Sequence, residues 1–192
     1  MENNAKVTLS KTLPKPVLFS SICIFLQKSI LMRINTERLR NFFEKMSEVG
    51  KIGETGTCRP AHSAVEKEAF LLAAQWMNKA GMSTRIDNFG NLIGRLEGTN
   101  PALPILMMGS HLDSQPYGGR FDGVAGVLCA IEAVTTLTEN GMKPSRTIEV
   151  VSFADEEGWR FKKGLFGSRG ILGNLENGEL ERQDKEGVTR AE

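Results

Sequence analysis

Five side chains that can bind a metal ion or move a proton fall in two short segments of the chain. One segment contains His111 and Asp113, with Asp122 a few residues later, and the other contains the adjacent Glu156 and Glu157. One imidazole together with carboxylates favours zinc, manganese or cobalt, whereas carboxylates alone would favour magnesium or calcium. The residue types therefore indicate a divalent-metal site with a further carboxylate that could act as a general base.

The order of these residues indicates different tasks for neighbouring side chains. Alternate residues of an extended segment point the same way, so Asp113 can reach the imidazole of His111 and fix its tautomer. Flanking glycines and the start of a helix favour an anion at Asp122, where a carboxylate could bridge two cations. Neighbours in an extended chain face opposite ways, so one of Glu156 and Glu157 could bind metal while the other acts as a base.

Each of these elements has a simpler interpretation when it is taken alone. A lone histidine after a strand is usually a structural residue, and a pair of glutamates usually lies in a solvated turn. Taken together, the acidic groups would repel one another without a cation. The second histidine, His62, lies in a polar loop before a helix, and we interpret it as a surface or capping residue. The glycine-rich segment 118–126 matches neither phosphate-loop pattern, which argues against nucleotide binding.

Hydrophobic periodicity and capping residues predict the elements that must position these side chains. Helices are predicted at about 36–49, 63–80, 122–140 and 165–172, and strands at 82–87, 91–96, 105–108 and 147–154. The segment 105–108 is wholly apolar, so we expect a strand buried on both faces. Strands that alternate with helices predict a layered α/β sheet, and such sheets place ligands at the carboxyl ends of their strands. Both polar clusters follow such ends.

The composition is that of a soluble globular protein with one main domain. The 192 residues include 24 Lys and Arg against 23 Asp and Glu, and 40% are hydrophobic. The near-neutral balance argues against a nucleic-acid partner. Cys23, Cys58 and Cys129 are widely spaced and form no CxxC motif. This usage argues against a disulfide framework and a thiolate zinc site, and it favours a cytoplasmic location.

Residues 1–31 differ in character from the rest of the chain. Lysines precede an apolar stretch from Val17 to Leu26, which is the order of a secretory signal. The stretch is shorter than the roughly 20 residues of a membrane span, and no cleavage-site pattern follows it. We interpret 1–31 as an extension before a natural start at Met32, either disordered or a weak targeting peptide, and 32–192 as the N-terminal part of a metal-dependent catalytic domain. No membrane partner is expected.

Longer motifs give the sequence a family resemblance. GSHLDSQPYGGRFDGVAGVL (109–128), SFADEEGWRF (152–161) and DNFGNLIGRLEG (87–98) resemble the hydantoinase/carbamoylase family of amidohydrolases. That family includes N-carbamoyl-L-amino-acid hydrolases, β-ureidopropionases and allantoate amidohydrolases, within a wider group of binuclear metallopeptidase-like enzymes. The resemblance covers 32–192. It implies an α/β catalytic domain of the aminoacylase/carboxypeptidase type, with a layered mixed sheet flanked by helices.

The resemblance also implies a role for each candidate residue. His111 would bind one of two divalent ions (zinc, manganese or cobalt), Glu157 would bind the other, and Asp122 would bridge them. Glu156 would be the general base, and Asp113 would orient the metal site. The implied reaction is hydrolysis of the carbamoyl C–N bond of a small N-carbamoyl-L-amino acid, with release of the amino acid, carbon dioxide and ammonia. Allantoate is the alternative substrate.

The chain departs from the family pattern in length and in histidine content. By the resemblance, members are about twice as long, and later residues supply two more histidine ligands and a smaller domain that mediates homodimerisation. His62 precedes the first motif and matches neither missing ligand. Each ion would then lack one imidazole. We expect the N-terminal portion of a catalytic domain, active only when the remainder is supplied, or alternatively a non-catalytic remnant. The homodimer is not expected for this chain.

Overall fold

The computed structural model describes residues 32–191, and the residues from Ile34 onward form one compact unit. The extension at 1–31 lies outside the described residues. The helices are α2 (Thr36–Glu48), α3 (Ala64–Lys79), α4 (Val124–Glu139) and α5 (Phe166–Ile171). The strands are β1 (Lys51–Ile52), β2 (Gly56–Arg59), β3 (Ser83–Ile86), β4 (Leu92–Leu96), β5 (Leu106–His111), β6 (Ser114–Gly119) and β7 (Ile148–Phe153).

The larger sheet is mixed and has the strand order β3-β4-β7-β5. β4 pairs antiparallel with both β3 and β7, whereas β5 and β7 run parallel. The last residues of the two parallel strands, His111 and Phe153, stand opposite each other in this register. The carboxyl ends of β5 and β7 therefore meet at one edge of the sheet, as the sequence predicted. The α/β architecture with a mixed, helix-flanked sheet is confirmed.

Local signals in the sequence explain where the helices begin. The side chain of Asn35 accepts a hydrogen bond from the N–H of Arg38 at the start of α2, and Ser63 does the same for Glu66 at the start of α3. These caps satisfy N–H groups that the first helical turn leaves unpaired. α4 begins later than predicted, after Gly123, whose φ of 64° no other residue type adopts as readily. Asp122 consequently lies in the turn before the helix.

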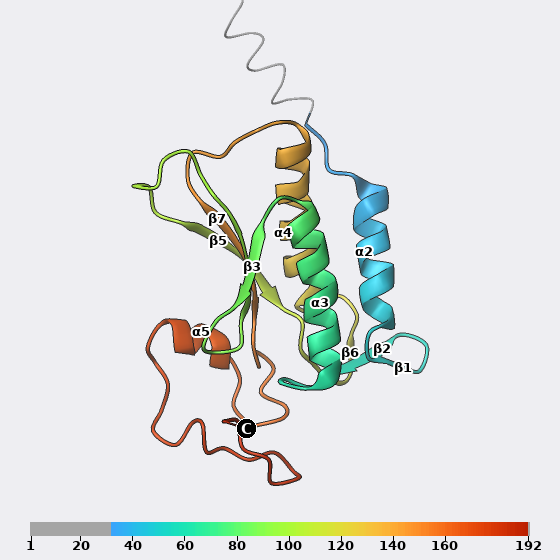
Figure 1. The fold of residues 1–192 in the computed structure, drawn as a ribbon. Helices are drawn as coiled ribbons and strands as arrows, with labels where there is room; N and C mark the ends of the chain where they lie inside the picture. The colour runs from blue at the N-terminus through green and yellow to red at the C-terminus, as the bar shows by residue number, and fades with distance from the viewer. Residues whose placement is uncertain (1–31, 192) are drawn as a thin grey trace, which may run out of the picture. The chain divides into compact units, whose positions relative to one another are not determined.

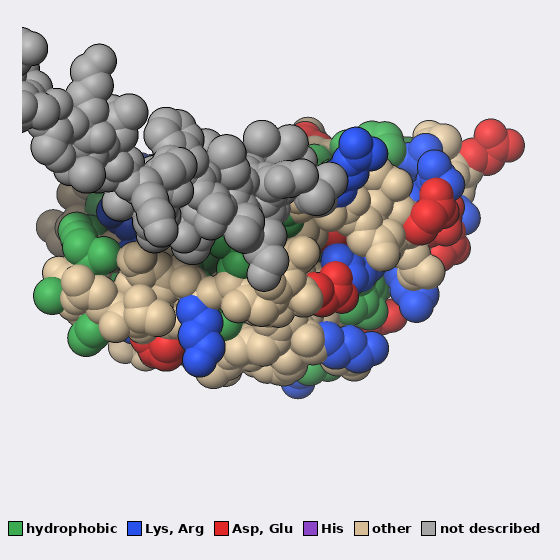
Figure 2. All heavy atoms as spheres, turned by 90° about the horizontal axis from the view of Figure 1, so that it is seen from above, with side chains coloured by type: hydrophobic (Ala, Val, Ile, Leu, Met, Phe, Trp, Pro, Cys, Tyr) green, Lys and Arg blue, Asp and Glu red, His purple; other side chains and the backbone are tan. Residues whose placement is uncertain are grey.

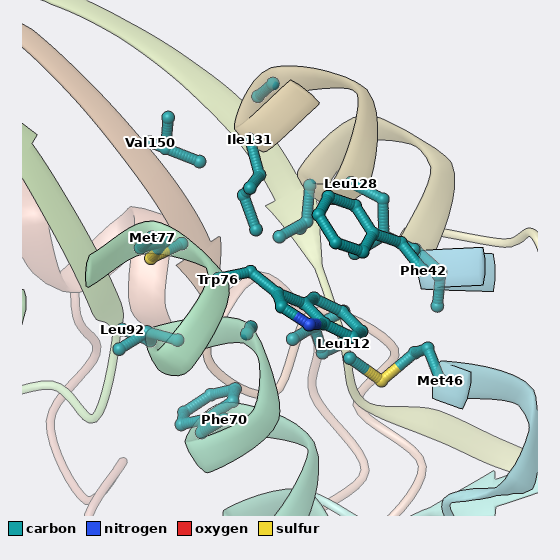
Figure 3. Close-up of a cluster of buried hydrophobic side chains, with 14 of the residues drawn as sticks. Phe42, Met46, Phe70, Trp76, Met77, Leu92, Leu112, Leu128, Ile131 and Val150 are labelled. Atoms are coloured by element: carbon teal, nitrogen blue, oxygen red, sulfur yellow. The ribbon is translucent and has the colours of Figure 1, made fainter. Parts of the chain in front are cut away.

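The long helices α2, α3 and α4 lie on the same side of the larger sheet (Figure 1). Their apolar faces form one buried cluster together with residues of β4 and β7. Trp76 of α3 stacks on Phe42 of α2 with ring centroids 4.3 Å apart, and Leu112 belongs to the same buried cluster (Figure 3). Leu112 is completely buried and lies between His111 and Asp113. The core therefore anchors the chain segment that carries the first candidate motif.

The prediction that 105–108 is buried on both faces is wrong. Leu106 is 46% exposed and Met107 is 39% exposed. The reason is position, because β5 is the last strand of the described sheet and has a neighbour, β7, on one side only. By contrast, the first five residues of β7, which has strands on both sides, are buried. The apolar run thus identified a strand but not its place in the sheet.

A second, smaller sheet of order β1-β2-β6 was not predicted. β2 pairs antiparallel with β6, and the register places Arg59 opposite Ser114. The glycine- and proline-containing sequence of β6, SQPYGG, has no alternating apolar pattern, so backbone pairing alone reveals it as a strand. Strand β6 of this sheet begins directly after the His111–Asp113 segment.

The surface carries interspersed charges. On the part of the face that Figure 2 shows, Lys and Arg side chains lie among Asp and Glu side chains. None of the helices in the described part of the chain has both the length and the apolarity that a membrane-spanning helix requires.

Candidate functional site

The candidate site is built around His111, the last residue of β5. Its imidazole is buried, and Nε2 lies 3.3 Å from Oε2 of Glu156 and 3.9 Å from Oδ1 of Asp122. These partners come from two other segments, the turn after β7 and the turn before α4. The structure therefore brings together the imidazole and the carboxylates that the sequence singled out.

Asp113 connects the two motifs, and it lies within reach of the His111 imidazole, as the sequence predicted. Nδ1 of His111 lies 3.0 Å from the backbone carbonyl oxygen of Asp113 and 3.6 Å from its carboxylate. The carboxylate also accepts hydrogen bonds from the backbone N–H groups of Glu156 (3.2 Å) and Glu157 (3.1 Å). The carbonyl thus favours a proton on Nδ1 and leaves Nε2 facing the other acids. The carboxylate holds the turn that carries the two glutamates.

Gly123 allows the backbone before α4 to approach the imidazole. A Cβ atom at this position would lie 2.5 Å from three atoms of the His111 ring. The same turn carries Asp122, whose side chain is 61% exposed. Backbone packing against one face of the ring therefore fixes the imidazole, while the carboxylate of Asp122 remains accessible from solvent.

The turn after β7 positions Glu156 and Glu157. Asp155 has a left-handed backbone conformation with φ of 47°, so the chain turns rather than continuing the strand. The sequence analysis assumed an extended chain at the two glutamates, and this assumption is wrong because the chain bends there. Oε2 of Glu156 points to His111, whereas Oε1 of Glu157 is buried without a hydrogen-bond partner among the described residues.

Charge interactions shift the ionisation of the site residues. Burial lowers the pKa of His111, but the hydrogen bond and charge of Asp113 together with the charge of Glu156 outweigh this and raise it to about 9. Burial raises the pKa of Glu157. The charge of His111 lowers this pKa, and the charges of the neighbouring acids raise it further. These shifts are those of an acidic cluster that holds one cationic partner.

The residue types at the site are suitable ligands for the divalent ions that the family resemblance implies. The number of ligands is too small to complete the coordination of an ion. Imidazole nitrogen and carboxylate oxygen are common zinc and manganese ligands, and the unpartnered oxygen of Glu157 is a buried acceptor that a cation would satisfy. Among residues 32–191, however, no three His, Cys, Asp or Glu side chains converge so that they could hold one ion as they stand.

Two supporting residues were not identified from the sequence as part of the site. Arg59 is fully buried, and its Nε donates a 2.6 Å hydrogen bond to the carbonyl of Leu112. Asn91 is also fully buried, and its side-chain oxygen accepts the N–H of Ala154 at 2.8 Å, just before the turn with the two glutamates. Asn91 lies in the DNFGN motif, which was quoted for the resemblance. Nothing in the sequence around Arg59 pointed to the site.

Comparisons with known proteins agree with this arrangement. The model of peptidase family M28 matches residues 91–184, which contain every candidate site residue. An N-carbamoyl-L-amino-acid amidohydrolase from Pseudomonas sp. (strain NS671) is 48% identical over 159 residues, which cover 83% of this chain and 38% of that protein. The crystal structure of a hydantoinase/carbamoylase family amidase from Burkholderia ambifaria superposes with a TM-score of 0.81 at 38% identity. The chain belongs to the hydantoinase/carbamoylase family.

The match to other members of the family covers a part of their length. The superposition on the Burkholderia ambifaria structure covers 85% of this chain and 40% of that one. An allantoate deiminase from Glycine max is 38% identical over 148 residues, which cover 75% of this chain and 31% of that protein. The chain thus spans less than half the length of the hydantoinase/carbamoylase proteins that it matches.

Proposed function

We propose that this chain is part of a metal-dependent amidohydrolase that cleaves the carbamoyl C–N bond of N-carbamoyl-L-amino acids. The observation that carries the proposal is that Asp122 and Glu156 each lie within 4 Å of Nε2 of His111, where β5 and β7 end together, and that the charge of His111 acts on Glu157. The identity of 48% to an N-carbamoyl-L-amino-acid amidohydrolase supports the choice of substrate class. His111, Asp122 and Glu157 would hold two divalent ions.

The residues of the chain divide the chemistry between binding and proton transfer. When bound, the ions would lower the pKa of a water molecule and polarise the substrate carbonyl. Glu156 would accept a proton from the attacking water and pass it to the leaving nitrogen as the C–N bond breaks. Water thereby adds to the carbamoyl carbon, the amino acid leaves with the transferred proton on its nitrogen, and the carbamic acid that remains breaks down to carbon dioxide and ammonia. Asp113 would hold Glu156 in place through the N–H of that residue.

A second candidate substrate is allantoate. The identity of 38% to an allantoate deiminase favours it, because allantoate also carries a ureido group. This identity is lower than the 48% to the carbamoylase, and it extends over 148 rather than 159 residues. The carbamoyl amino acid is therefore the preferred assignment, with allantoate as the comparison substrate in the test.

The 192-residue chain is expected to show no turnover by itself with zinc, manganese or cobalt. His111 and Glu157 would each bind one ion and Asp122 would bind both, so each ion would have two protein ligands, whereas catalytic sites generally use three. The test is a chimera in which residues 32–191 replace the matching portion of the Pseudomonas carbamoylase. Ammonia release from N-carbamoyl-L-amino acids and from allantoate is measured. Turnover by the 192-residue chain alone that is lost in Glu156→Gln would contradict the expectation.

Variants in the chimera assign the site. Alanine at His111, Asp122 or Glu157 should lower both metal content and rate, whereas Glu156→Gln should retain metal and lose at least about a hundredfold in rate. Glu186→Gln is a matched control, because Glu186 is exposed and lies in the C-terminal segment. Unchanged metal content and rate in the three alanine variants would show that the assignment is wrong.

A further inference from the structure

Arg59 is an arginine whose burial has no explanation in packing alone. It is the largest side chain in the described residues that is fully buried, with an exposed fraction of 0%. Nε donates to the carbonyl of Leu112 at 2.6 Å and Nη1 donates to the carbonyl of Val49 at 3.1 Å, while Nη2 is buried without a partner among the described residues. No carboxylate in that part of the chain forms an ion pair with it. A buried cation without a paired anion is costly, so such a residue indicates a task beyond stability.

The contacts of Arg59 are directed at the first motif. Leu112, whose carbonyl accepts the 2.6 Å hydrogen bond, stands between His111 and Asp113. The backbone N–H of Arg59 also donates to Oγ of Ser114 at 3.0 Å, on the other side of Asp113. Arg59 therefore fixes the chain immediately before and immediately after Asp113. Burial lowers the pKa of this guanidinium, and the charge of Asp113 partly counteracts that effect.

Asp113 transmits this anchoring to the second motif. Its carboxylate accepts the N–H groups of Glu156 and Glu157, and its carbonyl lies 3.0 Å from Nδ1 of His111. A shift of Asp113 would therefore move both the imidazole and the turn that carries the glutamates. The path from Arg59 to that turn consists of consecutive hydrogen bonds and one peptide unit.

We propose that Arg59 is a positioning residue of the site, whose buried guanidinium fixes the carbonyl of Leu112 and thereby places Asp113 between His111 and the Glu156–Glu157 turn. The inference deepens the proposed function, because it takes His111, Glu156 and Glu157 as the groups that do the chemistry. Arg59 itself touches neither substrate nor reacting atoms.

The test measures amide hydrogen exchange by NMR in the metal-free 192-residue chain. The rates at Glu156 and Glu157 are divided by those at Val150 and Val151, which lie in β7 and are fully buried. Arg59→Met should raise this ratio about tenfold or more, because the carboxylate of Asp113 no longer holds the two N–H groups. Arg59→Lys keeps the charge and one donor, and it should raise the ratio by about two- to fivefold.

Arg38→Met is the matched control. Arg38 pairs with Glu132, whose side chain is 1% exposed, so its loss also lowers stability, but these residues join α2 to α4 away from the two motifs. In this variant the exchange rates should rise together and leave the ratio within about twofold of wild type. If Arg59→Met does not fold, the Arg59→Lys ratio decides.

The proposal is overturned by a wild-type ratio in Arg59→Lys or in folded Arg59→Met, since Arg59 would then support the fold without positioning the site. An equal rise of the ratio in the Arg38 control also overturns it. The measurement needs neither metal nor substrate, so these failures are distinct from a failure of the proposed reaction, which the chimera tests.

Discussion

Replacement of Glu66 by glutamine is expected to stabilise the chain at alkaline pH and to leave it almost unchanged near pH 5. Glu66 lies in the first turn of α3 and is 3% exposed. One of its carboxylate oxygens accepts the N–H of His62, and the other is buried without a partner in the described part of the chain. Burial, reinforced by the charge of Asp113, raises the pKa of Glu66 from 4.5 to about 8.

The sign of the pH effect follows from which state keeps the proton. Below pH 4.5 the carboxyl group is neutral in both the folded and the unfolded chain. As the pH rises from 4.5 to about 8, the unfolded chain loses this proton and the folded chain keeps it, so the free energy of unfolding falls. At about 1.36 kcal/mol per pH unit the full loss is roughly 5 kcal/mol. Relaxation around the charge reduces it, so we expect roughly 2 to 5 kcal/mol.

Glutamine at position 66 has no proton to lose and avoids this cost. Urea unfolding followed by tryptophan fluorescence at about pH 5 and about pH 8.5 measures the difference, because Trp76 is buried in the core. With a slope of about 2 kcal/mol per molar urea, the midpoint of Glu66→Gln should exceed that of wild type by about 1 M or more at the higher pH. Glu68→Gln, at an exposed position of the same helix, is the control. A midpoint difference that is equal at both pH values would refute the reasoning.

Two further substitutions test the packing around the site and in the core. Gly123→Ala should displace the His111 ring, because the new Cβ would lie 2.5 Å from ring atoms. Gly141→Ala is the control, because Gly141 has a similar φ of 66° but open space around it. The His111 imidazole NMR signals should change in the first variant only, and an equal change in both would contradict the contact. Phe42→Ala removes the ring that stacks on Trp76 and should lower the free energy of unfolding by about 3 to 5 kcal/mol, measured by urea unfolding, and a loss below about 1 kcal/mol would argue against this stack.

The sequence predicted the parts of the fold that depend on local signals. The helices predicted at about 36–49 and 63–80 and the strand predicted at 147–154 are determined by neighbouring residues, and the structure confirms all three as α2, α3 and β7. The exposure of β5 and the existence of β6 depend on which strand lies beside which, and local patterns carry no such information. The candidate ligands were predictable because polar residues at strand ends stand out from apolar runs.

The supporting contacts of the site could not be predicted in the same way. Arg59 precedes Leu112 by 53 residues and reaches it because β2 pairs with β6, a pairing for which the sequence gives no apolar pattern. Asn91 reaches Ala154 across 63 residues through the pairing of β4 with β7. In both contacts a side chain binds a backbone group of the other residue. Every residue type has such a backbone group, so the identity of the contacted residue does not reveal the contact.

The structure also changes the argument from charge repulsion that first indicated a metal. Four acids around one imidazole would repel one another, but the raised pKa of His111 supplies a positive charge, and the N–H groups of the glutamate turn satisfy the carboxylate of Asp113. Repulsion alone therefore does not require an ion. What the imidazole and these N–H groups leave unsatisfied is Oε1 of Glu157, which is buried without a partner among residues 32–191. The case for a cation depends on that oxygen, and the metal content of a chimera carrying Glu157→Gln is accordingly its most direct measurement.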